Sequence, residues 1–461
     1  MSSDQSLGNL GLTPTSLAPV MQGLCLRPSK VLITNAQIDS RLCQAGSVFF
    51  AIRGSSVDGA AFIQDAQSRG AAAVVVPRHQ GPMALATVNC AVIAVDDALS
   101  ALHMLARFYI KEHRHVTLIG ITGSVGKTTT KEALATILSY SGPTAKTPGN
   151  LNSEYGLPLS IFTLALGDRY GVFELGIDHV GEMERLVSTL TPSYALLTNV
   201  GISHLEKFGS TAVTAHEKAR IFHPAIEAGF VSAHCSHLSL IQKRSPTVLQ
   251  QYSLADIKAI DLGLEGWRLT WKGQTFTIRA VGRHLLEDVV GAITVADRLG
   301  LDAPSIARSL EGFGSMPGRT SVQSGAITII DDTYNASWDS TSTIVSYLSR
   351  LMWQGGKKVV LGPMKELGSA SESAHRKVAG LLARSSFTGA HLYGPEMEVA
   401  KDELKRLGFG GEVTWTEDFD ILGQQVKRTV EKGDLVLLKA SRSVAIDRLI
   451  PSLSQQWGAY A

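Results

Sequence analysis

The sequence predicts an α/β fold divided into three domains, and three observations support this prediction. Short apolar runs that read as buried strands alternate with longer segments of helical periodicity over most of the chain. The 461 residues exceed the usual size of one domain, which is about 100–200 residues. Hydrophobic residues make up 44% and charged residues 18% of the sequence, so the chain can fill several cores.

The predicted strands are short apolar runs bounded by turn or loop residues. In chain order they span residues 47–52, 72–77, 116–121, 171–175, 195–200, 326–330, 359–362 and 435–438. Residues 248–280 follow another pattern, because apolar side chains such as Trp267 and Phe276 alternate with polar ones around Lys272-Gly273. This alternation predicts a β-hairpin, and the helical pattern over residues 285–299 would close the domain that contains it.

Domain boundaries are expected where the alternation of strands and helices restarts, near His113 and Pro317. The prediction is an N-terminal domain of residues 1–113, a central domain of residues 114–317 and a C-terminal domain of residues 318–461. Residues 1–29 contain Ser, Gly and Pro but no basic start followed by an apolar core, so they do not read as a secretory signal. We expect them to form a loose extension.

Charge and cysteine content exclude several classes of protein. A formal net charge of +2 gives no global basic field, so neither nucleic acid nor an anionic membrane is an expected partner. The cysteines, Cys25, Cys43, Cys90 and Cys235, are too scattered for a disulfide framework or a zinc site, which favours a reducing compartment. No apolar run reaches the ~18 residues of a membrane span. We therefore expect a cytoplasmic monomer without membrane insertion.

A glycine-rich loop predicts an ATP site. The strand over residues 116–121 leads into residues 122–129, Thr-Gly-Ser-Val-Gly-Lys-Thr-Thr, and a helix with an apolar stripe follows. Glycines let backbone N–H groups turn toward phosphate oxygens, and the helix N-terminus adds positive potential. Lys127 can reach the terminal phosphates, and the Thr128 hydroxyl can bind Mg²⁺. The residues expected to hold the nucleotide here are Gly123, Ser124, Gly126, Lys127, Thr128 and Thr129.

The loop departs from the strict Walker pattern, because Ile121 stands where that pattern has glycine. In this form, and with the motifs after it, the chain resembles the Mur ligase family from about Asp39 to Arg442. Asp-Asp-Thr-Tyr-Asn-Ala at 331–336 and Met-Lys-Glu-Leu-Gly at 364–368 are most similar to the members that add D-alanyl-D-alanine. The other similar segments follow one another at residues 147–152, 156–159, 174–176, 198–201, 204–205, 216–222 and 318–319, and His375 comes last.

The resemblance implies a domain plan and a reaction. The N-terminal domain would bind a UDP-sugar, the central domain would be a parallel-sheet ATPase-type domain, and the C-terminal domain would be Rossmann-like and bind the acceptor. ATP would convert the carboxylate of UDP-N-acetylmuramoyl-tripeptide into an acyl phosphate, which the amine of D-alanyl-D-alanine attacks to give the pentapeptide precursor of peptidoglycan. Three domains around the ATP site also predict closure on substrate binding, which shields the acyl phosphate from water.

The resemblance also assigns site residues. Glu174 ends a predicted strand beside the phosphate loop. The residues implied as ligands of two Mg²⁺ ions are Thr128, Glu174, His204 and Lys218, with Lys218 carbamylated. Those similar to the catalytic residues of the family are Lys127, Glu174, His204, Lys218 and Arg319. Those expected at the nucleotide beyond the loop are Asp288, Arg319, Asp332 and Asn335, and those expected at the UDP-precursor are Ser40, Arg41, Asn150 and Asn152.

Some positions depart from the family pattern. Leu285 and Asp288 replace asparagines that usually lie near the adenine, so the adenine contacts stay undefined. Pro363 and Ala440 differ from the usual residues on the acceptor side. The sequence also does not specify the third residue of the peptide in the UDP-precursor.

Alternatives stay open for the reaction and for single residues. One is the branch that adds a diamino acid to UDP-N-acetylmuramoyl-dipeptide, whose usual Asp-Asn-Pro-Arg motif is absent here. Another is a nucleotide-binding relative without ligase activity, which would have little use for a retained metal site. Lys218 as an unmodified amine would contact phosphate or substrate directly. Lys439 and Arg442 would either hold a carboxylate or form surface pairs.

Overall fold

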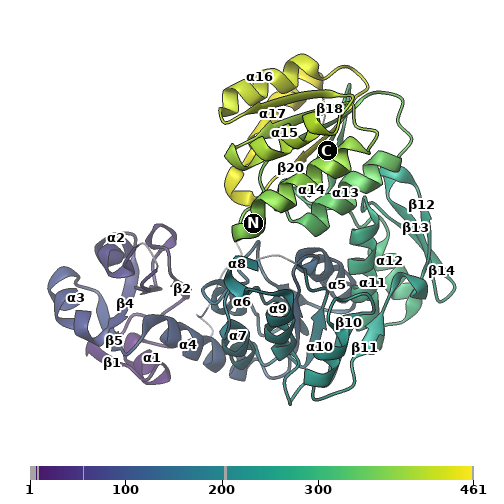
Figure 1. Cartoon of the computed structure of the whole chain (residues 1–461). Coiled ribbons are helices and arrows are strands. Elements are labelled where there is room, and N and C mark those ends of the chain that lie inside the picture. Colours follow the sequence, from purple (N-terminus) through teal and green to yellow (C-terminus); the bar gives the residue numbers. More distant parts are fainter. Residues whose placement is uncertain (1–6, 8–9, 55–56, 202–204, 459–461) are drawn as a thin grey trace.

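The computed structural model describes residues 7, 10–54, 57–201 and 205–458 of the chain (Figure 1). Within these residues the strands form one sheet near the N-terminus, two in the middle of the chain and one near the C-terminus, all covered by helices. The predicted α/β class is therefore confirmed. In this described part of the chain, no helix is both long and apolar enough to cross a membrane.

The first sheet has the strand order β1-β5-β4-β3-β2, and only β1 runs antiparallel to its neighbour. Its strands are β1 (Leu24–Arg27), β2 (Asn35–Gln37), β3 (Ser47–Phe50), β4 (Ala71–Pro77) and β5 (Ala91–Val95). Its helices are α1 (Pro14–Val20), α2 (Ile63–Ser68), α3 (Gly81–Thr87) and α4 (Ala98–Glu112). The short helix η2 (Ser40–Leu42) follows β2.

The expectation that residues 1–29 form a loose extension is wrong for the part that the structure describes from Pro14 onward. Thr13 caps α1 by accepting the Ser16 N–H, and Leu17 and Met21 are buried. Strand β1 then pairs with β5, so this segment closes one edge of the sheet. The helix and the strand of this segment are too short for a hydrophobic period to predict them from the sequence.

The central sheet is parallel throughout, with the order β11-β10-β9-β6-β8-β7. Its strands are β6 (Thr117–Thr122), β7 (Thr144–Lys146), β8 (Tyr170–Glu174), β9 (Tyr194–Leu197), β10 (Ala228–Ser232) and β11 (Gln250–Tyr252). The helices around it are α5 (Lys127–Ser141), α6 (Gly156–Ile161), α7 (Glu182–Leu190), α8 (Leu205–Phe208), α9 (Thr211–Lys218) and α10 (Leu238–Arg244). Because all strands run the same way, the loops after β6, β8 and β9 meet at one edge.

A small antiparallel sheet follows, and it contains the predicted hairpin. Its strands are β12 (Lys258–Asp261), β13 (Trp267–Trp271) and β14 (Gln274–Ile278). Lys272 and Gly273 both have positive φ, at 43° and 79°, as a two-residue hairpin turn requires. The predicted helix is also confirmed as α11 (Arg283–Arg298), and α12 (Ala303–Leu310) comes next.

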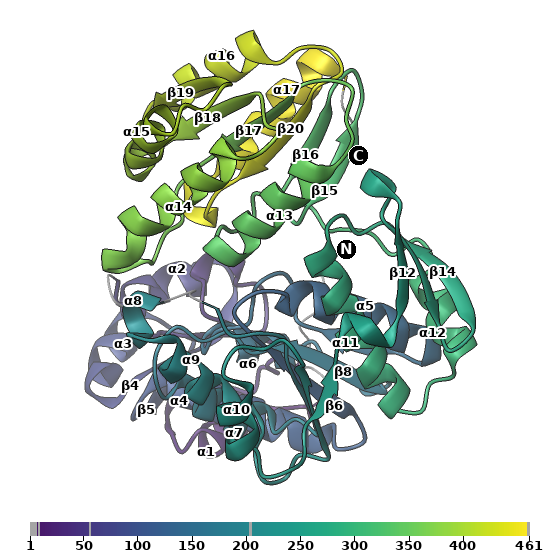
Figure 2. The same ribbon diagram turned by 45° about the vertical axis from the view of Figure 1, so that its right-hand side comes forward.

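The last sheet has the order β15-β16-β20-β17-β18-β19, with β15 antiparallel to the rest. Its strands are β15 (Ser321–Ser324), β16 (Thr328–Asp331), β17 (Lys357–Leu361), β18 (Gly389–Tyr393), β19 (Glu412–Thr416) and β20 (Leu435–Lys439). Its helices are α13 (Trp338–Arg350), α14 (Ser371–Ala383), α15 (Glu398–Arg406), α16 (Phe419–Thr429) and α17 (Leu449–Trp457). Figure 2 shows these helices distributed around the sheet. Val359 and Val360 belong to different apolar clusters, as expected for a strand covered on both faces.

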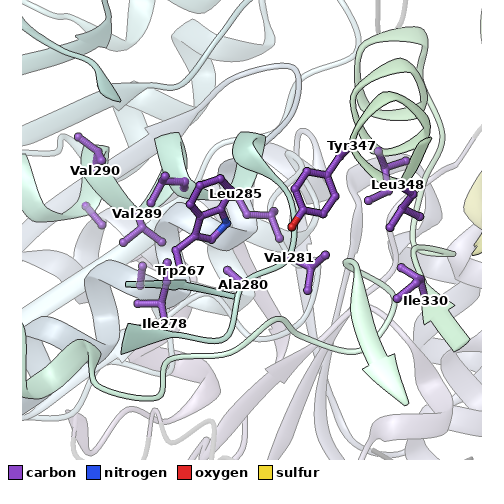
Figure 3. Packing of buried hydrophobic residues seen from close by; sticks show 14 of the residues in the cluster. Trp267, Ile278, Ala280, Val281, Leu285, Val289, Val290, Ile330, Tyr347 and Leu348 are labelled. Atoms are coloured by element: carbon purple, nitrogen blue, oxygen red, sulfur yellow. The ribbon is translucent and has the colours of Figure 1, made fainter. Parts of the chain in front are cut away.

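An apolar cluster joins the middle of the chain to the C-terminal sheet (Figure 3). Trp267 from β13 and Val289 from α11 lie in the same cluster as Leu348 from α13 and Ile330 from β16. The Tyr347 hydroxyl donates to Asp261 Oδ1 at 2.9 Å, which adds a polar contact between α13 and β12. The small sheet therefore packs against elements on both sides of residue 318.

Candidate active site

A cavity of about 800 Å³ opens where the central strands end and residues of the C-terminal sheet approach them. Its lining contains most of the residues predicted from the sequence. They are Ser124, Gly126, Lys127, Thr128, Thr129, Asn150, Asn152, Glu174, Asp288, Arg319, Asp332 and Asn335. The geometry therefore collects residues from segments that are far apart in the sequence.

The phosphate loop is fixed by the strand end next to it. Asn199, just after β9, accepts the Ser124 N–H on its carbonyl oxygen and the Val125 N–H on Oδ1, both at 3.0 Å. Gly126 has a φ of 87°, and a Cβ there would lie 2.1 Å from Asp288 Oδ1, so only glycine fits without a shift. Helix α5 begins at Lys127, which places its N-terminus at the cavity.

A half-buried lysine, Lys127, and a buried one, Lys218, share one backbone acceptor in the phosphate loop. Lys127 Nζ donates to the Gly123 carbonyl at 2.7 Å, and Lys218 Nζ donates to the same oxygen at 3.2 Å. Burial lowers the pKa of both amines, and each is further affected by its neighbours. For Lys218 the second cause is the charge of Lys127, and its pKa falls well below the usual lysine value. Lys218 thus lies against the loop at Gly123, although neither of these two residues lines the cavity itself.

Glu174, the last residue of β8, offers a carboxylate at the bottom of the cavity. Its side chain is 1% exposed, and Oε2 accepts from Asn152 Nδ2 at 3.0 Å. Within the described residues, Oε1 has no hydrogen-bond partner. A buried carboxylate oxygen with free lone pairs, in the same cavity as the Thr128 hydroxyl, has the chemistry that Mg²⁺ prefers.

Arg319 brings the C-terminal part of the chain to the phosphate loop. Its Nη2 donates to Thr128 Oγ1 at 2.8 Å, and its guanidinium lies 3.9 Å above the Tyr334 ring. The cation is therefore held between an aromatic face and the loop, where it faces the same space as Lys127.

Asp332 and Asn335 are joined by a lysine from the neighbouring strand. Lys439, at the end of β20, is 1% exposed and donates to Asp332 Oδ2 at 2.6 Å and to the Asn335 carbonyl at 3.0 Å. The alternative in which Lys439 forms a surface pair is therefore wrong. Arg442, by contrast, is exposed and pairs with Asp447 at 3.1 Å.

Asp288 is a buried carboxyl on α11 that faces the loop. Burial, reinforced by Glu287, raises its pKa to about 8, while Arg319 and Lys127 act in the opposite direction. At neutral pH it is therefore mostly protonated. A protonated aspartic acid is neutral, as asparagine is. Asp288 is therefore closer to the asparagine of the family pattern than an ionised aspartate would be.

The structure does not bring every predicted residue to this cavity. Ser40 and Arg41 lie in the N-terminal part, in η2, and are absent from the cavity lining. Ser40 Oγ donates to Asp65 Oδ2 at 2.7 Å, whereas Arg41 is exposed and pairs with Asp39. His204 lies outside the described residues.

Two residues of the site escaped the interpretation of the sequence. Asn199 stood in a recognised motif, but its role in holding the loop required the position of β9 beside β6. Lys131 is 1% exposed and lies 3.4 Å from Glu174 Oε1. The sequence offered one signal for Lys131, because this lysine falls on the same helix face as the apolar residue Leu134. A lysine on a buried face is rare unless it is paired.

Comparison with family models covers most of the chain. The model described as "Mur ligase family, catalytic domain" matches residues 32–110, "Mur ligase middle domain" matches 121–296, and "Mur ligase, glutamate ligase domain" matches 318–442. The matched ranges follow the order of the sheets described above.

Whole-chain comparisons agree with these models. A UDP-N-acetylmuramoyl-tripeptide--D-alanyl-D-alanine ligase from Treponema pallidum is 36% identical, over 91% of this chain and 93% of that protein. The crystal structure of MurF from Acinetobacter baumannii has a TM-score of 0.84 and 25% identity, over 96% of this chain and 98% of its own. MurF from Thermotoga maritima in complex with ADP has a TM-score of 0.77 and 29% identity, over 92% and 98%. With its motifs, its four sheets and this similarity along its length, the chain belongs to the Mur ligase family.

Proposed function

We propose that this chain is an ATP-dependent ligase that joins D-alanyl-D-alanine to UDP-N-acetylmuramoyl-tripeptide. The relative from Treponema pallidum is named for this reaction, and the Thermotoga maritima structure was solved with ADP. The observation that carries the proposal is the hydrogen bond from Arg319 to Thr128. It joins the phosphate loop to the C-terminal sheet at one cavity, where a nucleotide and two further substrates can meet.

The chemistry follows from the charges in this cavity. The substrate carboxylate attacks the γ-phosphorus of ATP, forming an acyl phosphate and releasing ADP. The neutral amine of D-alanyl-D-alanine then attacks the acyl carbon, so an amide bond forms, and phosphate and a proton leave. Lys127 and Arg319 would offset the negative charge of the anions that must approach one another.

Mg²⁺ fits the donor set that the structure presents, and the ion would screen the phosphate charge. Thr128 and Glu174 would hold it, and His204 is proposed as a further ligand by resemblance. Lys218 is proposed to be carbamylated, because only a neutral amine reacts with CO₂ and burial lowers the pKa of this one. A carbamate would turn the lysine into an oxygen ligand. Incorporation of ¹³C-bicarbonate, lost in Lys218→Ala, is the expected NMR result.

Other site assignments and the domain limits are proposals of the same kind. Ser124, Gly126, Thr129, Asp288, Asp332 and Asn335 would contact the nucleotide, and Asn150 and Asn152 the UDP-precursor. Ser40 and Arg41 are proposed for the UDP end of that substrate, since they lie in η2, which follows β2 of the N-terminal sheet. We propose boundaries after residues 113 and 317, which fall in the connections between sheets. The monomeric state and the cytoplasmic location stay predictions.

Phosphate release measured with two substrate mixtures tests the reaction. One mixture holds ATP, UDP-N-acetylmuramoyl-tripeptide and D-alanyl-D-alanine; the other holds ATP, UDP-N-acetylmuramoyl-dipeptide and lysine or diaminopimelate. Turnover in the first mixture alone is expected. Turnover in the second alone would instead assign the diamino-acid reaction, and silence in both with ATP still bound would favour the non-catalytic relative.

Substitution of the loop lysine tests the site itself. Lys127→Ala should abolish phosphate release, because the phosphates lose the cation that the phosphate loop contributes to the cavity. Lys432→Ala, at an exposed lysine far along the chain, is the matched control and should keep full activity. Unchanged turnover in Lys127→Ala, with thermal unfolding like that of the parent, would exclude this cavity as the active site.

A further inference from the structure

Lys131 is a buried lysine with a complete set of acceptors one helical turn after Lys127. Its Nζ donates to the Thr147 carbonyl at 2.9 Å and lies 2.9 Å from Glu132 Oε1 and 3.4 Å from Glu174 Oε1. An ammonium has three donors, and here each one has an oxygen to face. The position of the charge is therefore fixed by α5, β8 and the residue that follows β7.

The Glu132 carboxylate in this cluster also pairs with a second lysine. Glu132 Oε2 is paired with Lys146, whose side chain is 45% exposed. Glu132 thus divides its two oxygens between Lys146 and Lys131. Glu174 has only Lys131 as a cation within ion-pair distance among the described residues, so Lys131 is the charge that offsets its burial.

The long distance to Glu174 decides what Lys131 can do for it. At 3.4 Å the ion pair offsets charge, but Glu174 Oε1 still has no hydrogen-bond partner in the described chain. Oε1 therefore keeps lone pairs that no donor of the described residues fills, in a residue that lines the cavity. Thr147 strengthens this arrangement, because its Oγ1 accepts the Glu174 N–H at 2.9 Å while its carbonyl accepts from Lys131.

From this geometry we infer that Lys131 is a positioning residue, which holds the Glu174 carboxylate in the orientation that a divalent cation in the cavity requires. Asn152 fixes the other carboxylate oxygen, so the two residues together define the orientation of the group. The inference rests on the proposed function, since it takes Glu174 as a metal ligand.

The test measures ADP binding by calorimetry in Mn²⁺ and in EDTA. The dissociation constant in EDTA divided by that in Mn²⁺ gives a ratio that reports the contribution of the metal. Lys131→Met keeps the length of the side chain but removes its charge, and should reduce the ratio about 10- to 100-fold. Lys146→Met is the matched control, because it removes the exposed lysine from the same Glu132 and should leave the ratio unchanged.

A charge-balanced variant covers the case in which Lys131→Met does not fold. Lys131→Met/Glu132→Gln leaves one cation and one carboxylate, so it should recover thermal stability and ADP binding in EDTA while the ratio stays low. A ratio like that of the parent in this double variant would overturn the inference, and so would an equal loss of affinity with and without metal.

Glu174→Gln separates this inference from the proposed function. If Glu174→Gln lowers the ratio and the Lys131 variants do not, Glu174 binds metal without help from Lys131. If Glu174→Gln leaves the ratio unchanged, the proposed metal role of Glu174 fails, and the inference about Lys131 fails with it.

Discussion

At the scale of single residues, the site contains ionisable groups whose pKa values are shifted by burial. Lys127 and Lys218 meet at one carbonyl, and burial lowers the pKa of both. Asp288 faces the phosphate loop, and burial raises its pKa to about 8. In each of these groups, burial disfavours the charged form relative to the same group in water.

Asp288→Asn should stabilise the protein more at pH 9 than at pH 5. Asp288 has a pKa of about 8 in the folded state, whereas in the unfolded chain its pKa is the usual 3.8 of an aspartic acid. The destabilising effect of the carboxyl therefore grows as pH rises through this window and is fully present above it. The gain at pH 9 should exceed about 1 kcal/mol, measured by urea unfolding.

The control for this experiment is a second Asp→Asn change on the same helix, because the charged neighbours of Asp288 are unchanged in both variants. Glu287, Arg319 and Lys127 all act on Asp288 and stay in place in the variant. Asp297→Asn makes the same change on the same helix, at a residue that pairs with Lys272 at the surface, and should show no such pH-dependent gain. An equal effect of Asp288→Asn at both pH values would contradict the prediction.

At the scale of elements, the start of α5 is tightly constrained by its surroundings. Gly126 precedes it with a left-handed conformation, φ 87° and ψ −15°, and Asp288 from α11 lies directly against it. Gly181 precedes α7 with almost the same backbone, φ 94° and ψ −16°, but nothing lies within 4 Å of a Cβ built there. The two positions differ only in their surroundings.

Gly126→Ala should therefore destabilise the protein more than Gly181→Ala. Both variants place alanine at positive φ, which costs about 1–2 kcal/mol, but only Gly126→Ala also displaces a buried carboxyl. We expect Gly126→Ala to lose about 1–3 kcal/mol more in chemical unfolding and to bind ADP more weakly. Similar losses in the two variants would show that Asp288 moves aside freely.

At the scale of the whole molecule, the proposed reaction requires that Arg319, which precedes the C-terminal sheet, stay at the loop of the central sheet. The apolar cluster that contains Trp267, Leu348 and Ile330 supplies much of this contact (Figure 3). Tyr347 lies within this cluster, and its ring centroid is 6.5 Å from that of Trp267. Its hydroxyl donates a hydrogen bond to Asp261. The small antiparallel sheet thus acts as the structural link between the two larger ones.

Tyr347→Ala should weaken this link and lower both stability and turnover. Removing a buried aromatic side chain costs about 3–5 kcal/mol, and loss of the contact would let Arg319 leave Thr128. Tyr347→Phe removes only the hydroxyl and should cost about 1 kcal/mol with near-normal turnover. Calorimetry and phosphate release measure the two effects, and a Tyr347→Ala variant as active as the parent would argue against the link.

The sequence by itself determined the parts that depend on local pattern. The eight predicted strands correspond to β3, β4, β6, β8, β9, β16, β17 and β20. The turn at Lys272-Gly273 and the phosphate loop were also specified locally, because turn residues and glycines fix the backbone where they stand. Short or edge strands such as β1 and β7 were not predicted, since a few residues carry too little periodicity.

Only the tertiary structure decided which side chains meet. Arg319 and Thr128 are 191 residues apart, and Lys439 and Asp332 are 107 apart, so no spacing rule relates them. Lys131 reads locally as one more charged helix residue, yet packing of α5 against β8 makes it the counter-charge of Glu174. The physical reason is that local sequence fixes periodicity and turns, whereas burial, and with it charge state and pairing, depends on how distant segments pack.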